Sequence, residues 1–228
     1  TLVQLIPRLY DVSEGAITVD GKDLFKLNEK ELVEYKRDTV GFVWQNNARN
    51  LVPYLTSLQD VQLPMRFGSE KRQRARAYEL LEMVGMAHKA NNHLNQMSGG
   101  EQQRIAIAIA LANNPKILLA DEPTGSVDVK TGTYILDMFR DINRSTGLTI
   151  VIVTHDPELA KITDETIYLR DGKKVDGDSA EPTPAEINQF LKQFEQMQKM
   201  FKQLNSKNTK KMMRKFKNGP KGMNFPFA

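Results

Sequence analysis

The sequence predicts an α/β domain with a mostly parallel sheet. Short apolar runs alternate with helical patterns along the chain, as they do where helices connect parallel strands. The chain has 228 residues and 40% hydrophobic content, which is enough to bury the core of one large domain. Its longest apolar run, 105–112, is far shorter than the roughly 18 to 20 residues that span a bilayer. Cysteine is absent, which fits a reducing compartment, so we expect a cytosolic location.

Hydrophobic spacing predicts the main elements in order. Apolar residues at helical spacing over 2–9 predict an amphipathic helix at the start of the chain. Apolar runs over 39–44, 116–120 and 148–154 are typical of buried parallel strands. Helical spacing over 130–144 connects the last two strands and completes a βαβ unit.

Two further segments complete the predicted domain. The pattern between 57 and 112 is helical. Its basic run 70–77 fits a solvated helix face, because a nucleic-acid site would need interleaved aromatic residues and a larger basic field. The segment 167–175, "IYLRDGKKV", predicts a hairpin that turns at Asp171 and Gly172.

Two carboxylates directly follow the predicted strand 116–120. In "KILLADEP", Asp121 and Glu122 lie at the carboxyl end of the strand, where open parallel sheets bind their ligands. Adjacent residues leaving a strand point in different directions. We therefore expect Asp121 to hold Mg²⁺, directly or through water, and Glu122 to polarise an attacking water molecule. Taken alone, the same residues would also fit a solvated turn.

A second motif precedes an apolar helix. "MSGGEQQR" places Ser98, Gly99 and Gly100 at the start of that helix, where backbone N–H groups and a hydroxyl meet the positive helix end. The two glycines allow a phosphate to approach the backbone closely. The motif therefore predicts an anion-binding site, although such a segment on its own is often only a helix cap.

Two polar residues end the other predicted strands. His155 closes the strand 148–154, and Gln45 follows the strand 39–44. Because the carboxyl ends of parallel strands share one edge of a sheet, we expect His155 to lie beside Glu122. Gln45 carries a neutral amide that can reach a metal ion or water. Either residue alone would more often be structural than catalytic, but the neighbouring motifs favour a functional site.

These motifs together resemble the nucleotide-binding subunit of ATP-binding-cassette (ABC) transporters, over about residues 1–175. "MSGGEQQR" is similar to the family signature, "ILLADEP" to the Walker B strand and "GSVD" to the D-loop. "THD", which contains His155, is similar to the switch-histidine segment, and Gln45 in "FVWQ" is similar to the Q-loop glutamine. The segment "RNLVPYLTSLQDVQLPM" is similar to the lipoprotein-release and macrolide-export branch.

The resemblance implies a P-loop NTPase fold of the ABC cassette type, with a helical subdomain at about 50–112. It implies an ATPase that powers a membrane transporter, in export or lipoprotein release. ATP and Mg²⁺ would be the cofactors, with Glu122 and His155 catalytic and with Asp121 and Gln45 at the Mg²⁺ ion. The nucleotide-binding residues implied by the family motifs are Thr1, Gln45, Ser98, Gly99, Gly100, Glu101 and Asp128.

The resemblance also implies partners. Two cassettes would pair head to tail, with each ATP lying between the Walker motifs of one subunit and Ser98, Gly99 and Gly100 of the other. Integral membrane permease subunits would bind the pair, select the substrate and hold it at the inner face of the cell membrane.

In this family a Walker A loop precedes the first helix, and Thr1 matches the last hydroxyl of that loop. The lysine and glycines of the loop, and the strand before it, are not in the sequence. We therefore expect an N-terminally truncated fragment of a cassette.

The C-terminal part differs from the cassette in composition. From Glu181 onward the chain carries ten Lys and Arg against three Glu, a net charge of +7, whereas residues 1–180 carry −3. We expect a cassette over 1–178 and, over 179–228, an amphipathic helix followed by a basic, Met-rich tail. The stretch 184–227 resembles the end of the methionine-rich domain of the signal recognition particle GTPase. We expect the tail to bind nucleic acid only weakly and without specificity.

Two alternatives to a transporter ATPase remain open at the level of sequence. The chain could be a catalytically incomplete cassette that supplies only the signature side of a dimer. It could also be a fragment joined to a tail like that of the signal recognition particle, with a targeting or RNA-associated role.

Overall fold

The computed structural model describes residues 2–46, 49–65, 69–156, 159, 162–170 and 173–176. The chain divides into two compact units, Thr1–Lys161 and Ile162–Ala228. The predicted C-terminal helix and basic tail lie outside the described residues, and the predicted boundary near residue 178 stays a prediction. Among the described residues, none of the helices combines the length and hydropathy that a membrane span requires.

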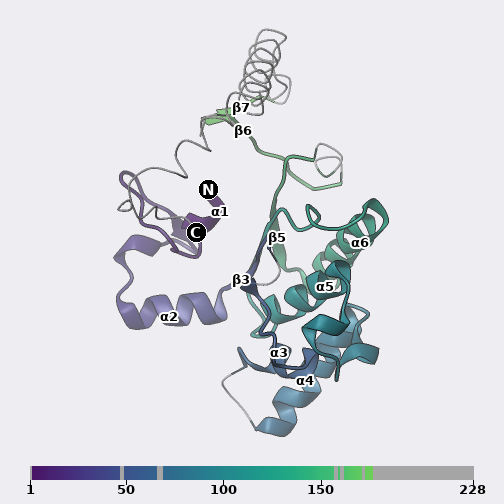
Figure 1. The fold of residues 1–228 in the computed structure, drawn as a ribbon. Coiled ribbons are helices and arrows are strands. Elements are labelled where there is room, and N and C mark those ends of the chain that lie inside the picture. The colour runs from purple at the N-terminus through teal and green to yellow at the C-terminus, as the bar shows by residue number, and fades with distance from the viewer. Residues whose placement is uncertain are drawn as a thin grey trace, which may run out of the picture. The chain divides into compact units, whose positions relative to one another are not determined.

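The first unit alternates short helices with strands (Figure 1). Its elements in order are α1 Leu2–Leu5, β1 Thr18–Val19, β2 Lys22–Asp23, the 3-10 helix η1 Leu24–Lys26, α2 Glu29–Asp38, β3 Val40–Val43, α3 Ser57–Gln62, α4 Glu70–Met83, the 3-10 helices η3 Ala87–Lys89 and η4 Leu94–Gln96, α5 Gly99–Ala110, β4 Ile117–Asp121, α6 Val129–Thr146 and β5 Thr149–Val153.

The described central sheet has the strand order β3-β4-β5, and both pairings are parallel. Val43 pairs with Ala120, and Asp121 pairs with Val153. The carboxyl ends of the three strands therefore lie side by side at one edge of the sheet, as the sequence predicts.

The continuous apolar runs of the strands follow from burial on both faces of the sheet. Leu118 and Ala120 pack into a cluster with side chains from α4, α5 and α6, whereas Leu119 packs into a second cluster with Tyr35 of α2. Figure 1 shows α5 and α6 on one side of the strands and α2 on the other. A strand that alternates between two apolar layers needs apolar residues at every position.

One glycine sets how closely α5 approaches the sheet. A Cβ atom on Gly41 of β3 would overlap the carbonyl oxygen of Ala110, at the end of α5, and would lie 3.0 Å from Cδ1 of Leu118. Only a residue without a side chain fits there, so the close packing of helix on strand depends on this position.

The start of the chain differs from its prediction. The expected amphipathic helix over 2–9 ends already at Leu5, and Leu9 is an exposed residue. Pro7 explains the difference, because it lacks a backbone N–H and disfavours helical geometry in the residue before it. Arg8 follows in the left-handed region, with φ 50°.

One short hairpin was not predicted. Strands β1 and β2 pair antiparallel around Asp20 and Gly21, whose φ angles are 51° and 74°. Two consecutive residues with positive φ are typical of the tightest hairpin turn, and Asp-Gly is its usual sequence signal. The signal was therefore present in the sequence.

The other predicted elements that fall on described residues are confirmed. The helical region expected between 57 and 112 contains α3, α4 and α5, and most of the basic residues of α4 are exposed. In the second unit, the expected hairpin is formed by β6 Tyr168–Arg170 and β7 Lys173–Val175, which pair antiparallel.

Candidate active site

Predicted site residues lie at the carboxyl ends of the three parallel strands. Gln45 comes two residues after β3, Asp121 ends β4 and His155 comes two residues after β5. The backbone N–H of Glu122 donates to the carbonyl of Val153 at 2.9 Å, which extends the pairing of β4 and β5 by one residue. The sheet therefore presents these side chains along one edge.

Glu122 has a left-handed backbone, with φ 47°. This geometry is uncommon for a residue other than glycine and costs on the order of 1 to 3 kcal/mol. The chain leaves β4 in a sharp turn at this residue, and the side chain of Glu122 is only 17% exposed. A strained conformation that places a carboxylate at a sheet edge is typical of a functional position.

The carboxylate of Glu122 is held by the segment that follows β5. Its Oε1 lies 2.7 Å from Nδ1 of His155 and accepts the backbone N–H of His155 at 3.0 Å. Its Oε2 accepts the Thr154 hydroxyl at 3.3 Å. The structure thus brings Glu122 and His155 together as the parallel strands predict. Thr154 was not singled out from the sequence, although it lies beside His155.

The pair has electrostatic consequences for the imidazole. The hydrogen bond that the imidazole donates to Glu122, together with the negative charge of this carboxylate, raises the pKa of His155 above its ordinary value. The His155 side chain is 85% exposed. Glu122 and His155 can therefore share a proton at the mouth of the site, where the imidazole remains accessible to a ligand.

Gln45 lies against the loop that follows Glu122. The Ser126 hydroxyl donates to the carbonyl oxygen of Gln45 at 3.4 Å, and Nε2 of Gln45 lies 3.9 Å from the position of a Cβ atom on Gly125. Asn50 holds the segment after β3. Its side chain donates to the Phe42 carbonyl at 2.9 Å and accepts the Trp44 N–H at 3.1 Å.

The signature residues cap α5. The Ser98 hydroxyl accepts the backbone N–H of Glu101 at 3.3 Å, and Glu101 accepts the backbone N–H of Ser98 at 2.8 Å. This reciprocal pair is a capping box. The Ser98 backbone N–H lowers the pKa of Glu101, and Lys89 lies 3.6 Å from its carboxylate. In this structure Glu101 stabilises the helix start that carries Gly99 and Gly100.

Asp128 caps α6 in a similar way. Its carboxylate accepts the backbone N–H of Thr131 at 3.1 Å and the Thr131 hydroxyl at 2.7 Å. These hydrogen bonds lower the pKa of Asp128. Thr1, the remaining predicted nucleotide contact, lies outside the described residues.

Asp121 is a predicted protein ligand of a Mg²⁺ ion whose other ligands would mainly be phosphate oxygens and water. Within the described part of the chain, no group of three or more His, Cys, Asp and Glu side chains could hold a metal ion. Mg²⁺ in nucleotide sites usually takes one or two protein oxygens and fills its octahedron with waters and phosphate oxygens. Asp121 ends β4 and Gln45 follows the neighbouring strand β3, and their side chains carry oxygens of the kind that Mg²⁺ accepts as ligands.

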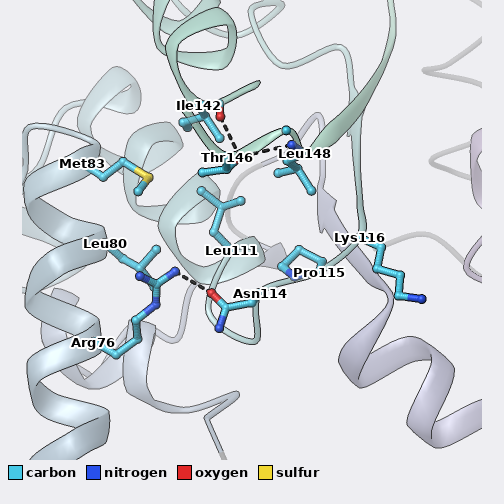
Figure 2. Close-up of a pocket in the computed structure, with 11 residues that line it drawn as sticks. Arg76, Leu80, Met83, Leu111, Asn114, Pro115, Lys116, Ile142, Thr146 and Leu148 are labelled. Atoms are coloured by element: carbon cyan, nitrogen blue, oxygen red, sulfur yellow. Dashed lines mark hydrogen bonds between the residues drawn. The ribbon is translucent and has the colours of Figure 1, made fainter. Parts of the chain in front are cut away.

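A cavity of about 400 Å³ lies elsewhere, at the amino ends of β4 and β5 (Figure 2). Side chains of α4, of the α5–β4 connection and of the end of α6 line it, and none of the predicted site residues is among them. Several of its polar groups are paired within the chain. Arg76 donates to Asn114 at 2.6 Å, and Thr146 donates to the Ile142 carbonyl at 2.6 Å. The cavity is therefore separate from the sheet edge that carries the candidate site.

The comparisons with known proteins agree with this geometry. The model of the ABC transporter family matches residues 1–125. The ABC transporter ATP-binding protein MJ0796 of Methanocaldococcus jannaschii is 44% identical over 179 residues, which cover 76% of this chain and 75% of that protein. The chain therefore belongs to the ABC transporter family and is an ATP-binding subunit of the ABC ATPase class. The predicted fold class, an ABC cassette with a P-loop NTPase fold, is confirmed.

Two further relatives and one solved structure bear on its function. The lipoprotein-releasing system ATP-binding protein LolD 2 of Caulobacter vibrioides is 44% identical over 160 residues, which cover 69% of this chain and 69% of that protein. The macrolide export protein MacB of Rhodopirellula baltica is 43% identical over 75% of this chain and 25% of its own length. A dimeric post-hydrolysis structure of MJ0796 with ADP and Pi matches with a TM-score of 0.68 and 39% identity, over 80% of each chain.

Proposed function

We propose that this cassette hydrolyses ATP to drive an exporter or a lipoprotein-release transporter, with Glu122 and His155 as its catalytic residues. The observation that carries the proposal is the contact between Glu122 and His155 at the carboxyl edge of the sheet. The names of the LolD 2 and MacB relatives support the direction of transport.

In the proposed mechanism Glu122 orients the attacking water and accepts its proton, while His155 contacts the γ-phosphate. Both oxygens of the Glu122 carboxylate are engaged here, one by Thr154 and one by His155. Release of the imidazole toward a phosphate would free one acceptor position on Oε1 for water, while the backbone N–H of His155 still donates to this oxygen. The exposed ring of His155 can make that movement without unpacking the core, and the phosphate would then replace Glu122 as the anion beside the imidazole.

Asp121 and Gln45 would hold the Mg²⁺ ion that accompanies ATP. When bound, the ion neutralises charge on the phosphates. Gln45 lies in the segment between β3 and α3, and Asn50 holds the start of this segment through its hydrogen bonds to Phe42 and Trp44.

The signature side of the cassette would bind the nucleotide of a second copy. Ser98, Gly99, Gly100, Glu101 and Asp128 lie at the starts of α5 and α6, whose positive helix ends suit phosphate. Thr1 would contact the nucleotide of its own subunit. The dimeric MJ0796 structure with ADP and Pi supports this arrangement. Permease subunits would bind the pair at the cytoplasmic face of the membrane.

Substitution of Glu122 tests the proposal. The assay compares the ATP turnover of the wild-type cassette with that of its variants. Glu122→Gln should lower the turnover of ATP on the order of 10² to 10⁴-fold, the contribution of a positioned general base, and should accumulate a nucleotide-bound dimer. Glu79→Gln, on the exposed face of α4, is the matched control and should keep its turnover. Wild-type turnover in Glu122→Gln would refute the assignment.

A further inference from the structure

The starts of α5 and α6 touch at a position where a side chain has no room. A Cβ atom on Gly100 would overlap Cγ2 of Thr131, and one on Gly99 would lie 3.8 Å from the carbonyl oxygen of Ser126. The backbone of α5 therefore packs directly against Thr131 and against the loop before α6. The absence of a side chain at Gly100 allows the two helix starts to approach this closely.

Thr131 also binds the carboxylate of Asp128, through groups other than the methyl group that faces Gly100. The Thr131 hydroxyl donates to one carboxylate oxygen of Asp128 at 2.7 Å, and the Thr131 backbone N–H donates to the other at 3.1 Å. Because the hydroxyl is fixed by Asp128, rotation about the Cα–Cβ bond is fixed too, and the methyl group must point in one direction. That direction is toward Gly100.

We propose that Thr131 is a positioning residue that sets the spacing between the Asp128 loop and the signature residues Ser98, Gly99 and Gly100. It uses both groups on its Cβ atom: the hydroxyl anchors Asp128 and the methyl group contacts Gly100. The inference rests on the proposed function, in which these two segments face the nucleotide of a second cassette. Thr131 itself touches neither nucleotide nor water in this proposal, so it is not a catalytic residue.

Each group of the side chain can be removed separately. Thr131→Val keeps a methyl group beside Gly100 but loses the hydroxyl bond to Asp128. It should raise the cassette concentration at half-maximal turnover about tenfold, a loss of about 1.4 kcal/mol of association energy, while ATP binding to the single cassette changes less than twofold. Thr131→Ser keeps the hydroxyl. Its cassette concentration at half-maximal turnover should therefore stay within about threefold of the wild-type value.

A second pair of variants tests the methyl contact. Gly100→Ala should destabilise the chain when Thr131 is present, because the new Cβ atom overlaps Cγ2. The double variant Gly100→Ala with Thr131→Ser should recover most of that stability, since the remaining Cβ and Oγ1 atoms lie at 3.5 and 3.6 Å. This non-additivity is measured by thermal unfolding and needs no ATP hydrolysis.

Thr133→Val is the matched control on the same helix. Its hydroxyl donates to the Val129 carbonyl at 3.0 Å, and the residue is exposed. It should change neither turnover nor dimer formation. The inference is overturned if Thr131→Val behaves like Thr133→Val, or if the stabilities of the Gly100 and Thr131 variants simply add. Absence of ATP hydrolysis in the wild-type cassette would instead refute the proposed function, and the unfolding measurements would still decide the contact.

Discussion

Asp60 is a buried carboxylate whose substitution gives a measurable change in stability. It lies in α3 and is 3% exposed. Its described hydrogen bond is the one that it accepts from the backbone N–H of Val52, at 3.1 Å. Burial raises the pKa of Asp60 from 3.8 to about 6, against the opposing effect of the Val52 bond. The folded chain therefore prefers the protonated form over a range of pH in which the unfolded chain is already ionised.

The size and sign of the effect follow from this pKa. One pKa unit corresponds to about 1.36 kcal/mol, so the rise from 3.8 to about 6 corresponds to about 3 kcal/mol. The stabilising contribution is fully present below pH 4 and is lost as the pH rises through about 6, because the folded state binds more protons than the unfolded state in that window. The substituted side chain of the variant Asp60→Asn has no proton to lose. The free energy of unfolding of this variant should therefore not fall as the pH rises from 4 to above 6.

The assay is urea unfolding of the wild type and Asp60→Asn between pH 4 and pH 7.5. The difference between their free energies of unfolding should shift by about 2.5 kcal/mol in favour of the variant as the pH rises across this range, because at pH 4 the unfolded Asp60 is already partly ionised. Asp141→Asn removes an exposed carboxylate of α6 and should leave the pH dependence unchanged. Parallel curves for the wild type and Asp60→Asn would refute a raised pKa of the buried Asp60.

Two other predictions concern the core and the catalytic pair. Gly41→Ala should lower the free energy of unfolding by about 1 to 3 kcal/mol, because the new Cβ atom would overlap the Ala110 carbonyl oxygen. Thermal unfolding measures the loss, and an unchanged transition would contradict the close packing of α5 on β3. Glu122→Gln should lower the pKa of His155 toward its ordinary value of 6.5, since Glu122 causes most of its rise. An NMR titration of the three histidines measures this shift, and an unchanged His155 curve would show that the pair does not form in solution.

The sequence predicted those features that depend on residues close together in the chain. The strands appeared as apolar runs because both faces of the sheet are buried. The cap at Ser98 joins residues three apart. The turn at Asp20 and Gly21 also needs only its own two residues, but it was not predicted although its signal is local. Such interactions need no partner from a distant part of the chain, so a short segment is enough to indicate them. The helix over 2–9 was predicted too long because its apolar spacing outweighed Pro7, which is also a local signal.

The tertiary structure alone decided which distant residues meet. That His155 and Glu122 would share one edge followed from the parallel strands, but the 2.7 Å contact depends on the register of β4 with β5 and on the left-handed backbone of Glu122. The contact of Thr131 with Gly100 and the burial of Asp60 have no signal in the spacing of residues. These features arise when helices and strands pack to interior density, and small shifts in that packing decide which atoms touch. The sequence by itself therefore determined the elements and the family motifs, whereas the packing determined how the site residues hold one another.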